Sequence, residues 1–271
     1  NEATGRVRGE TDSLPGRQTG GGAAPLKTAK EPGEKHRLEP YFNFGGRKFF
    51  NHMNPEQQKI IQKVADEVKQ KLEGEGSGHD WWHIVRVWNM AKHIGTSEGA
   101  DIFVVELAAL LHDIADWKFH DGDDTVGPKI ARQILEKHSV SAEIINQVCD
   151  IIMGMSFKGA GVKTEMKTLE GKVVQDSDRL DAIGAIGVAR TFAYGGHKNR
   201  PMYDPNKKPS MHQSKEEYFK SESPAINHFY EKLLLLKDRM NTKTAKELAE
   251  GRHSFMEEYL DRFFQEWGGK I

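Results

Sequence analysis

The stretch Ile102-Phe-Val-Val-Glu-Leu-Ala-Ala-Leu-Leu-His-Asp-Ile114 is an almost unbroken apolar run that closes on His112 and Asp113. It predicts a strongly apolar, buried helix over about 101–117. A histidine and an aspartate side by side at the end of such a helix are costly unless they are paired, hydrogen-bonded or bound to metal. The run therefore indicates a helical core with a candidate site at its end. A hydrogen-bonded core pair without metal is the alternative.

Helical spacing extends on both sides of this run. Apolar residues recur every three to four positions from Ile60 to Leu72, after Asn54 as N-cap and Pro55 at the first helical position. Further helices are predicted over about 80–93, 127–138, 141–154, 168–194, 215–238 and 242–266, with a long loop at 195–213. Strand-like alternation and internal repeats are absent from the sequence. The prediction is an all-α fold with one domain over 54–271.

The first 53 residues differ in composition from the rest. Residues 1–40 contain seven glycines and four prolines and almost no large apolar side chains, so they cannot bury enough surface to offset the entropy of ordering. We expect a disordered extension over 1–53. Its arginines would suit a transit peptide, but its acidic residues argue against one. Since a good helix start follows Met53, we hypothesise that the native product begins there, with a leader or vector-derived segment upstream.

The composition limits the classes of partner. The chain has 39 Lys and Arg against 40 Asp and Glu, so it carries no net positive charge that would favour binding to nucleic acid or to an anionic membrane. A single cysteine, Cys149, excludes an internal disulfide, and its apolar neighbours predict a buried, inert thiol. Apolar runs fall far short of the roughly 20 residues of a membrane span. We expect a cytoplasmic protein that acts on a small molecule, and a homodimer stays open.

Two further segments carry residues that suit a site. His83 follows His79 by four positions, so the two share a helix face. The tryptophans around it, Trp81, Trp82 and Trp88, are expected to pack the core. The second segment is Asp176-Ser-Asp-Arg-Leu-Asp181, with three aspartates in six positions although aspartate is a poor residue for helix interiors. Because an apolar run with Gly184 and Gly187 follows, a site is favoured over a solvated acidic turn, and these glycines are expected to permit close helix packing.

Together these segments resemble a known family. His83 with Arg86-Val87, then Leu110-Leu-His-Asp-Ile-Ala-Asp116, then Asp178-Arg-Leu180 is similar to the H…HD…D signature of the HD superfamily. The flanking residues look like the small stand-alone bacterial HD hydrolases of the YedJ/YpgQ type, over about 54–265. The resemblance implies an HD-domain helical bundle, a divalent metal ion and hydrolysis of a phosphoester or phosphoanhydride. It also implies a nucleotide substrate, in particular a nucleoside triphosphate cut to monophosphate and pyrophosphate.

The resemblance assigns the metal to His83, His112, Asp113 and Asp178. Two imidazoles and two carboxylates suit Mn²⁺ as the first choice, with Fe²⁺, Co²⁺, Ni²⁺ or Zn²⁺ as alternatives, and suit Ca²⁺ poorly. A metal of this kind polarises a phosphoryl oxygen and acidifies bound water. Asp178 is preferred to Asp176 because it precedes Arg-Leu. The two aspartates lie about 200° apart on a helix, so both should not bind one ion.

Acid–base chemistry is assigned to Asp116, which lies three residues after Asp113, with Asp121 as a possible second group. In related HD nucleotidases a carboxylate at the spacing of Asp116 takes this role, and a capping acid is the alternative. The phosphate-binding candidates are Arg86, Lys118 and Arg179.

For Arg179 the alternative is an ion pair with Asp176 or Asp181. Weaker site candidates are His79, Asp80, His120 and His197.

Two other functions remain open at this point. One is a different HD reaction, that of a 5′-nucleotidase or a phosphodiesterase. The other is a non-catalytic regulatory module that binds a metal or a nucleotide. The intact set of four candidate ligands together with Asp116 favours an enzyme, since a module without catalysis need not keep them.

Overall fold

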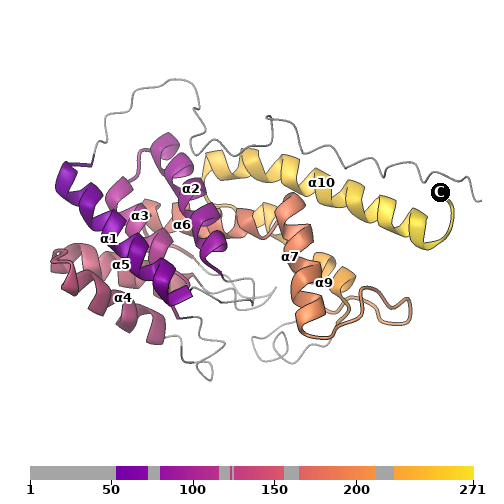
Figure 1. Cartoon of the computed structure of the whole chain (residues 1–271). Helices are drawn as coiled ribbons and strands as arrows, with labels where there is room; N and C mark the ends of the chain where they lie inside the picture. Colours follow the sequence, from indigo (N-terminus) through magenta and orange to yellow (C-terminus); the bar gives the residue numbers. More distant parts are fainter. Residues whose placement is uncertain (1–52, 73–79, 116–122, 124, 156–164, 212–222) are drawn as a thin grey trace, which may run out of the picture. The chain divides into compact units, whose positions relative to one another are not determined.

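The structure is a computed structural model that describes residues 53–72, 80–115, 123, 125–155, 165–211 and 223–271, which belong to the compact unit Lys48–Ile271. Throughout these ranges the regular structure is helical, with no strand, so the predicted all-α class is confirmed (Figure 1). The elements are α1 (Pro55–Leu72), α2 (Trp81–Glu98), α3 (Ile102–Leu111), α4 (Val126–Lys137), α5 (Ala142–Gly154), α6 (Leu169–Asp181), α7 (Gly184–His197), α9 (Ala225–Glu231), the 3₁₀ turns η3 (Leu233–Leu235) and η4 (Lys237–Arg239), and α10 (Lys243–Trp267).

Helix α3 lies at the centre of the core. All ten of its residues are buried, and it packs against α1, α2, α5 and α6. Its first turn is capped by Asp101, whose carboxylate accepts from the backbone N–H groups of Phe103 and Val104. The helix was predicted to reach residue 117 but ends at Leu111. There the Nδ1–H of His112 donates to the backbone carbonyl oxygen of Ala109 at 2.8 Å, and residues 112–115 form turns.

The single helix predicted over 168–194 is wrong. The structure has two helices there, and α6 ends at Asp181 before α7 begins at Gly184. Gly184 has a φ of +73°, a left-handed conformation that L side chains rarely adopt. One turn later, a Cβ on Gly187 would overlap the carbonyl oxygen of Ala182 and lie 2.5 Å from its carbonyl carbon. The two glycines therefore let the chain turn sharply between α6 and α7.

The helix predicted over 215–238 is also broken. In the described part, α9 ends at Glu231, and the two short 3₁₀ turns η3 and η4 follow; residues 212–222 lie outside the described residues. Helix α2 continues to Glu98, beyond its predicted end at 93, and stops where Gly99 adopts a φ of +77°. Residues 198–211 contain no helix or strand, in line with the predicted loop.

Helix α10 is attached to α6 through one buried carboxylate. Asp176 is fully buried and accepts hydrogen bonds from the backbone N–H and side-chain amide of Asn241, at 2.9 and 2.8 Å. It also accepts from the backbone N–H and hydroxyl of Thr242, both at 2.8 Å. Since Thr242 is the N-cap of α10, Asp176 holds the start of the C-terminal helix against α6.

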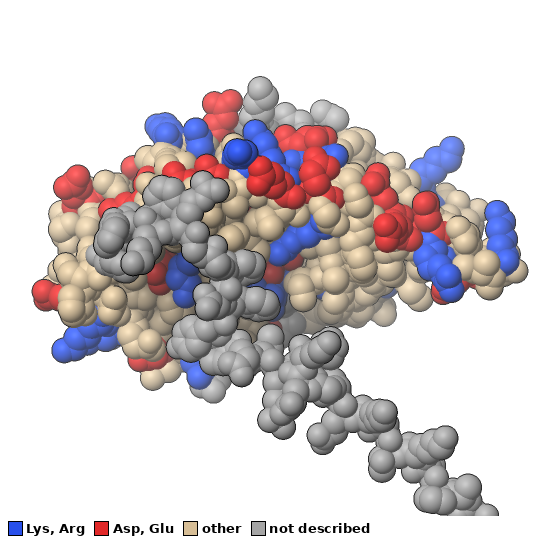
Figure 2. All heavy atoms as spheres, turned by 90° about the horizontal axis from the view of Figure 1, so that it is seen from above, with Lys and Arg blue, Asp and Glu red and all other residues tan. Residues whose placement is uncertain are grey.

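The described surface carries mixed charge. On the face seen in Figure 2, basic and acidic side chains are interspersed, as the net charge of −1 suggests. None of the described helices is both long and apolar enough to cross a membrane. Cys149 is buried and its thiol donates to the carbonyl of Pro128, and burial raises the pKa of this thiol. Trp81 and Trp88 pack against the core as expected, whereas Trp82 is 65% exposed, so the core assignment is wrong for Trp82.

The buried carboxylate of Glu106 leads to a prediction about pH. Burial raises the pKa of Glu106, against the opposing effects of Lys92 and of a 2.6 Å hydrogen bond from the Trp88 indole. The native state therefore holds this proton more tightly than the unfolded chain does. The cost of the charged form is absent well below pH 4.5 and present at neutral pH. We expect Glu106→Gln to gain stability relative to wild type at pH 7 and to lose that advantage as the pH falls towards 4.

Urea unfolding of both proteins at pH 7 and pH 4.5 measures this difference. Glu258→Gln, an exposed glutamate on α10, controls for the loss of one negative charge. A stability difference between Glu106→Gln and wild type that moves the opposite way with pH would contradict the prediction.

Candidate metal centre

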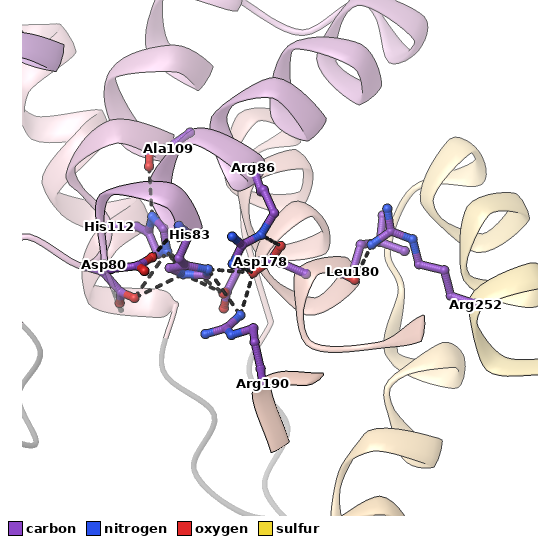
Figure 3. Close-up of polar contacts among 11 residues, drawn as sticks. Asp80, His83, Arg86, Ala109, His112, Asp178, Leu180, Arg190 and Arg252 are labelled. Carbon is purple, nitrogen blue, oxygen red and sulfur yellow. Dashed lines mark hydrogen bonds and ion pairs between the residues drawn. The ribbon is translucent and has the colours of Figure 1, made fainter. Parts of the chain in front are cut away.

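Side chains from three segments converge beside the end of α3. His83 comes from α2, Asp178 from α6, and His112 and Asp113 follow α3. His83 Nε2 lies 3.2 Å from His112 Nε2, 3.2 Å from Asp113 Oδ2 and 3.6 Å from Asp178 Oδ1 (Figure 3). His112 Nε2 lies 3.6 Å from Asp113 Oδ2 and 3.9 Å from Asp178 Oδ1. Ligand atoms of His83, His112 and Asp113 thus form one group, and Asp178 Oδ1 lies within 4 Å of both histidine Nε2 atoms.

The other ring nitrogen of each histidine is held by an acceptor. His112 Nδ1 contacts the backbone carbonyl of Ala109 at 2.8 Å, and His83 Nδ1 contacts Asp181 Oδ2 at 2.7 Å. Carbonyl and carboxylate oxygens only accept, so each Nδ1 carries a proton. In a neutral imidazole the Nε2 lone pair then faces the common point. Two such lone pairs 3.2 Å apart repel each other unless a proton or a metal ion lies between them.

The local fold positions His83. Asp80 is the N-cap of α2, and its carboxylate accepts the backbone N–H of His83 at 2.8 Å. The weak site candidate Asp80 is thereby assigned to capping. The side chain of His83 is fully buried, facing α6 across the core.

Burial and charge act in opposite directions on this site. Burial alone would lower the pKa of His83, but hydrogen bonds to Asp113 and Asp181 outweigh it and raise the pKa to about 9. Burial would raise the pKa of Asp181, but His83 and Arg86 donate to its carboxylate and hold the pKa well below its usual range. Without a metal the pair therefore exists as imidazolium and carboxylate at neutral pH. A metal ion held at Nε2 would replace the proton there.

The geometry fits a single divalent ion. Ligand atoms of His83, His112 and Asp113 all lie within 4.8 Å of one another. Two nitrogen or oxygen ligands each about 2.1 Å from one ion lie roughly 3–3.5 Å apart, close to the 3.2 Å between the histidine nitrogens. Two imidazoles with carboxylate oxygens make a donor set for first-row transition metals.

The two competing aspartates of α6 point to different places. Asp178 faces the histidines, and its side chain is 37% exposed, so it lies where a bound molecule can reach. Asp176 is saturated by Asn241 and Thr242 and contributes to the start of α10. The two carboxylates point to different partners because residues two positions apart lie on opposite sides of a helix.

Of the predicted phosphate ligands, Arg86 lies next to the site. It donates from Nε to Asp181 Oδ1 at 2.6 Å and from Nη2 to Asp181 Oδ2 at 3.0 Å. Arg179 is placed differently. Its guanidinium donates to the carbonyl of Arg239 and lies 3.9 Å from Asp176 Oδ1, which favours the alternative pairing over phosphate binding.

Several predicted residues lie outside the described residues. These are Asp116, Lys118 and Asp121, together with the weaker candidates His79 and His120. The last weak candidate, His197, is exposed at the end of α7.

Two residues of the centre were not predicted from the sequence. Asp181 was considered only as a partner for Arg179, although it lies three positions after Asp178, a spacing that returns to nearly the same helix face. Arg190 from α7 contacts Asp181 Oδ2 at 2.5 Å and lies 3.2 Å from His83 Nδ1. Because the sequence pattern ran one helix from 168 to 194, it offered no signal for the approach of Arg190.

Comparisons with known proteins identify the family of the chain. Residues 81–183 match the family model of the HD domain. The chain is 41% identical to Bacillus subtilis YpgQ over 203 residues, covering 74% of this chain and 91% of YpgQ. A crystal structure of YpgQ in complex with ADP matches with a TM-score of 0.62 and 37% identity, over 78% of this chain and 96% of that one.

Two further crystal structures are similar. One is an HD-superfamily hydrolase from Bacillus thuringiensis, with a TM-score of 0.62 and 46% identity over 78% of this chain and 98% of that chain. The other is a Lactobacillus plantarum protein, with a TM-score of 0.70 and 39% identity over 80% of this chain and 100% of that chain. The similarity therefore extends over 78–80% of this chain and over nearly the full length of the two solved structures.

Proposed function

This chain belongs to the HD-domain family, and we propose that it is a divalent-metal-dependent phosphohydrolase that cuts nucleoside triphosphates to monophosphate and pyrophosphate. The observation that carries the proposal is the proximity of His83, His112, Asp113 and Asp178. Each histidine Nδ1 also hydrogen-bonds to an acceptor on the side away from this cluster. The ADP complex of YpgQ, a relative of similar fold, supports a nucleotide as the ligand. The similarity to an HD-superfamily hydrolase supports hydrolysis as the reaction.

The proposed ligands of the metal are His83, His112, Asp113 and Asp178, and Mn²⁺ is the proposed ion. When bound, the ion supplies the positive charge that polarises a phosphoryl oxygen and acidifies a water molecule. The partial exposure of Asp178 supports a site that opens to substrate on the side of α6.

Cationic side chains next to the centre would bind the phosphates. Arg86 carries five N–H donors, and its hydrogen bonds to Asp181 use two of them. Arg86 and Arg190 together bring two positive charges beside one buried carboxylate, which leaves a net positive charge for an anionic substrate. Lys118 is proposed as a further phosphate ligand from its place in the sequence.

The proton transfers are proposed for Asp116, with Asp121 as a second group, from the spacing in the sequence. We expect Asp116→Ala to lower kcat by roughly 100-fold or more, the range typical of a lost general acid or base, and to leave Mn²⁺ affinity unchanged. Steady-state kinetics and a Mn²⁺ titration measure the two quantities. Asp150→Ala, at an exposed position on α5, is the matched control. Full activity in Asp116→Ala would mean that this carboxylate has no catalytic role.

The proposed partners follow from composition and from the centre. The substrate is a small phosphorylated molecule, since the near balance of 39 basic against 40 acidic residues supports neither nucleic acid nor an anionic membrane. A cytoplasmic location is proposed because the only cysteine is a buried free thiol.

Product analysis on a nucleotide panel tests the reaction. The protein is incubated with Mn²⁺ and each nucleoside tri-, di- and monophosphate, and the products are resolved by ion-exchange chromatography. Monophosphate with pyrophosphate from triphosphates is the expected result. Free phosphate from monophosphates would instead identify a 5′-nucleotidase, and no turnover with any metal would identify a binding module. His112→Ala, prepared in parallel, reports any contaminating phosphatase.

A further inference from the structure

We propose that Asp181 is a positioning residue that fixes the tautomer and orientation of His83 for metal binding, and that Arg86 and Arg190 hold Asp181 in place. This inference rests on the proposed function, because it assumes that His83 Nε2 binds the metal. Asp181 itself is neither a proposed ligand nor a group that touches substrate. Asp181 acts through the imidazole on the side opposite the metal.

The contacts of His83 Nδ1 decide its protonation. Asp181 Oδ2 lies 2.7 Å away and can only accept, whereas Arg190 Nη1 lies 3.2 Å away and can only donate. The shorter contact to a charged acceptor prevails, so Nδ1 carries the proton and Nε2 is left as the donor atom for a metal. A carboxylate bound to the far nitrogen of a metal-binding histidine both orients the ring and increases its basicity.

Asp181 is itself fixed by the two arginines. Arg86 binds both carboxylate oxygens, at 2.6 and 3.0 Å, which sets the plane of the carboxylate. Arg190 adds a contact of 2.5 Å to Oδ2, the oxygen that faces His83. The side chain of Asp181 is only 5% exposed, so water does not compete for these bonds. With donors on both oxygens, rotation of the carboxylate away from His83 would break several charge-assisted hydrogen bonds at once.

The sharp turn between α6 and α7 brings Arg190 next to Asp181. Asp181 is the last residue of α6, and Arg190 is nine residues later on α7. In an uninterrupted helix nine residues span about 13 Å, too far for a direct contact. At Gly184, with its positive φ, the chain changes direction, and Arg190 from α7 reaches the carboxylate of Asp181. Figure 3 shows Arg190 pointing towards this cluster. The break in the helix therefore serves the metal centre directly.

An asparagine at position 181 separates positioning from packing. Asp181→Asn keeps the shape, but its carbonyl oxygen is drawn to the arginines, which only donate. Two of the three arginine contacts go to Oδ2, so the amide oxygen keeps that place and the NH₂ group meets the Nε–H of Arg86. His83 Nδ1 then faces a neutral oxygen in place of a carboxylate, which orients the ring less firmly and lowers its basicity towards a metal. We expect Mn²⁺ affinity to fall about 10–100-fold, the usual effect of losing such an outer partner.

Asp176→Asn is the matched control. Asp176 is an equally buried aspartate of the same helix with four donor groups, but it contacts Asn241 and Thr242 instead of a histidine. We expect Asp176→Asn to lower the melting temperature and to bind Mn²⁺ like wild type. Calorimetric titration of chelator-treated, full-length proteins with Mn²⁺, together with thermal unfolding, gives both quantities without an activity assay.

A histidine ¹⁵N NMR spectrum of the wild-type protein loaded with Zn²⁺ provides a second measurement that does not depend on the variant folding. His83 should be protonated on Nδ1, and a bare Nδ1 would overturn the inference. Wild-type affinity in a folded Asp181→Asn protein would overturn it as well, with the proposed function intact. A wild-type protein that binds no Mn²⁺ would contradict the proposed function and the inference together.

Discussion

Replacing His112 with alanine should abolish Mn²⁺ binding and nucleotide hydrolysis together. His112 Nε2 lies within 3.9 Å of a ligand atom of each of the other three candidates, and its ring is held by the Ala109 carbonyl. Losing a ligand itself should cost more than the roughly 10–100-fold in affinity expected for an outer partner. The fold should survive, because leaving the Ala109 carbonyl without its partner costs only about 1–3 kcal/mol.

His138→Ala is the control for this experiment. That histidine is also mostly buried, but it caps α4 and contacts Glu67 Oε2 at 3.2 Å. Calorimetric Mn²⁺ titration and product analysis on both variants should show loss in His112→Ala alone. Wild-type Mn²⁺ affinity in His112→Ala would exclude His112 as a ligand.

Replacing Gly187 with alanine should produce the largest loss of stability. The added Cβ would overlap the carbonyl oxygen of Ala182, and a backbone atom cannot move aside as a flexible side chain can. Strain of this kind costs about 3 kcal/mol or more. For a chain of this size that corresponds to a melting temperature lower by roughly 6–12 °C. Moving the start of α7 would also separate Arg190 from Asp181, so Mn²⁺ affinity should fall as well.

Gly196→Ala tests whether this effect belongs to the position. Gly196 lies on the same helix, and a Cβ there meets nothing within 4 Å. Alanine is the better helix former by about 1 kcal/mol, so this variant should match or exceed wild type. Thermal unfolding followed by circular dichroism compares the three proteins. A melting temperature for Gly187→Ala within 2 °C of wild type would show that the turn between α6 and α7 tolerates a side chain at position 187.

The helices with a strong periodic pattern could be predicted from the sequence. Helices α1, α4, α5 and α10 begin and end within one or two residues of prediction, because regular apolar spacing marks their extent. The prediction failed where one side chain or one backbone angle determines where a helix ends. Helix α3 ends where His112 Nδ1 donates to the Ala109 carbonyl, and the chain turns sharply at Gly184, which has a positive φ. Apolar periodicity carries no information about either.

The candidate ligands could be named for a different reason. Histidine and aspartate are unusual in apolar helices, so His83, His112, Asp113 and Asp178 stand out against their neighbours. Their assignment to a metal stays a prediction. The residues around them could not be named, since Asp181 and Arg190 depend on how α6 and α7 cross. The salt bridge between Arg190 and Asp181 cannot be recognised until the turn between the two helices is known.

The hydrogen bonds of Asp176 show that the recognisable motif and the self-sufficient folding unit have different boundaries. The family match ends at residue 183, yet Asp176, inside it, accepts its described hydrogen bonds from Asn241 and Thr242. An excised segment 81–183 would leave a buried carboxylate without these donors, two residues from a proposed metal ligand. Any modular reuse of this site in a chimaeric protein must therefore carry the C-terminal helix along with the signature.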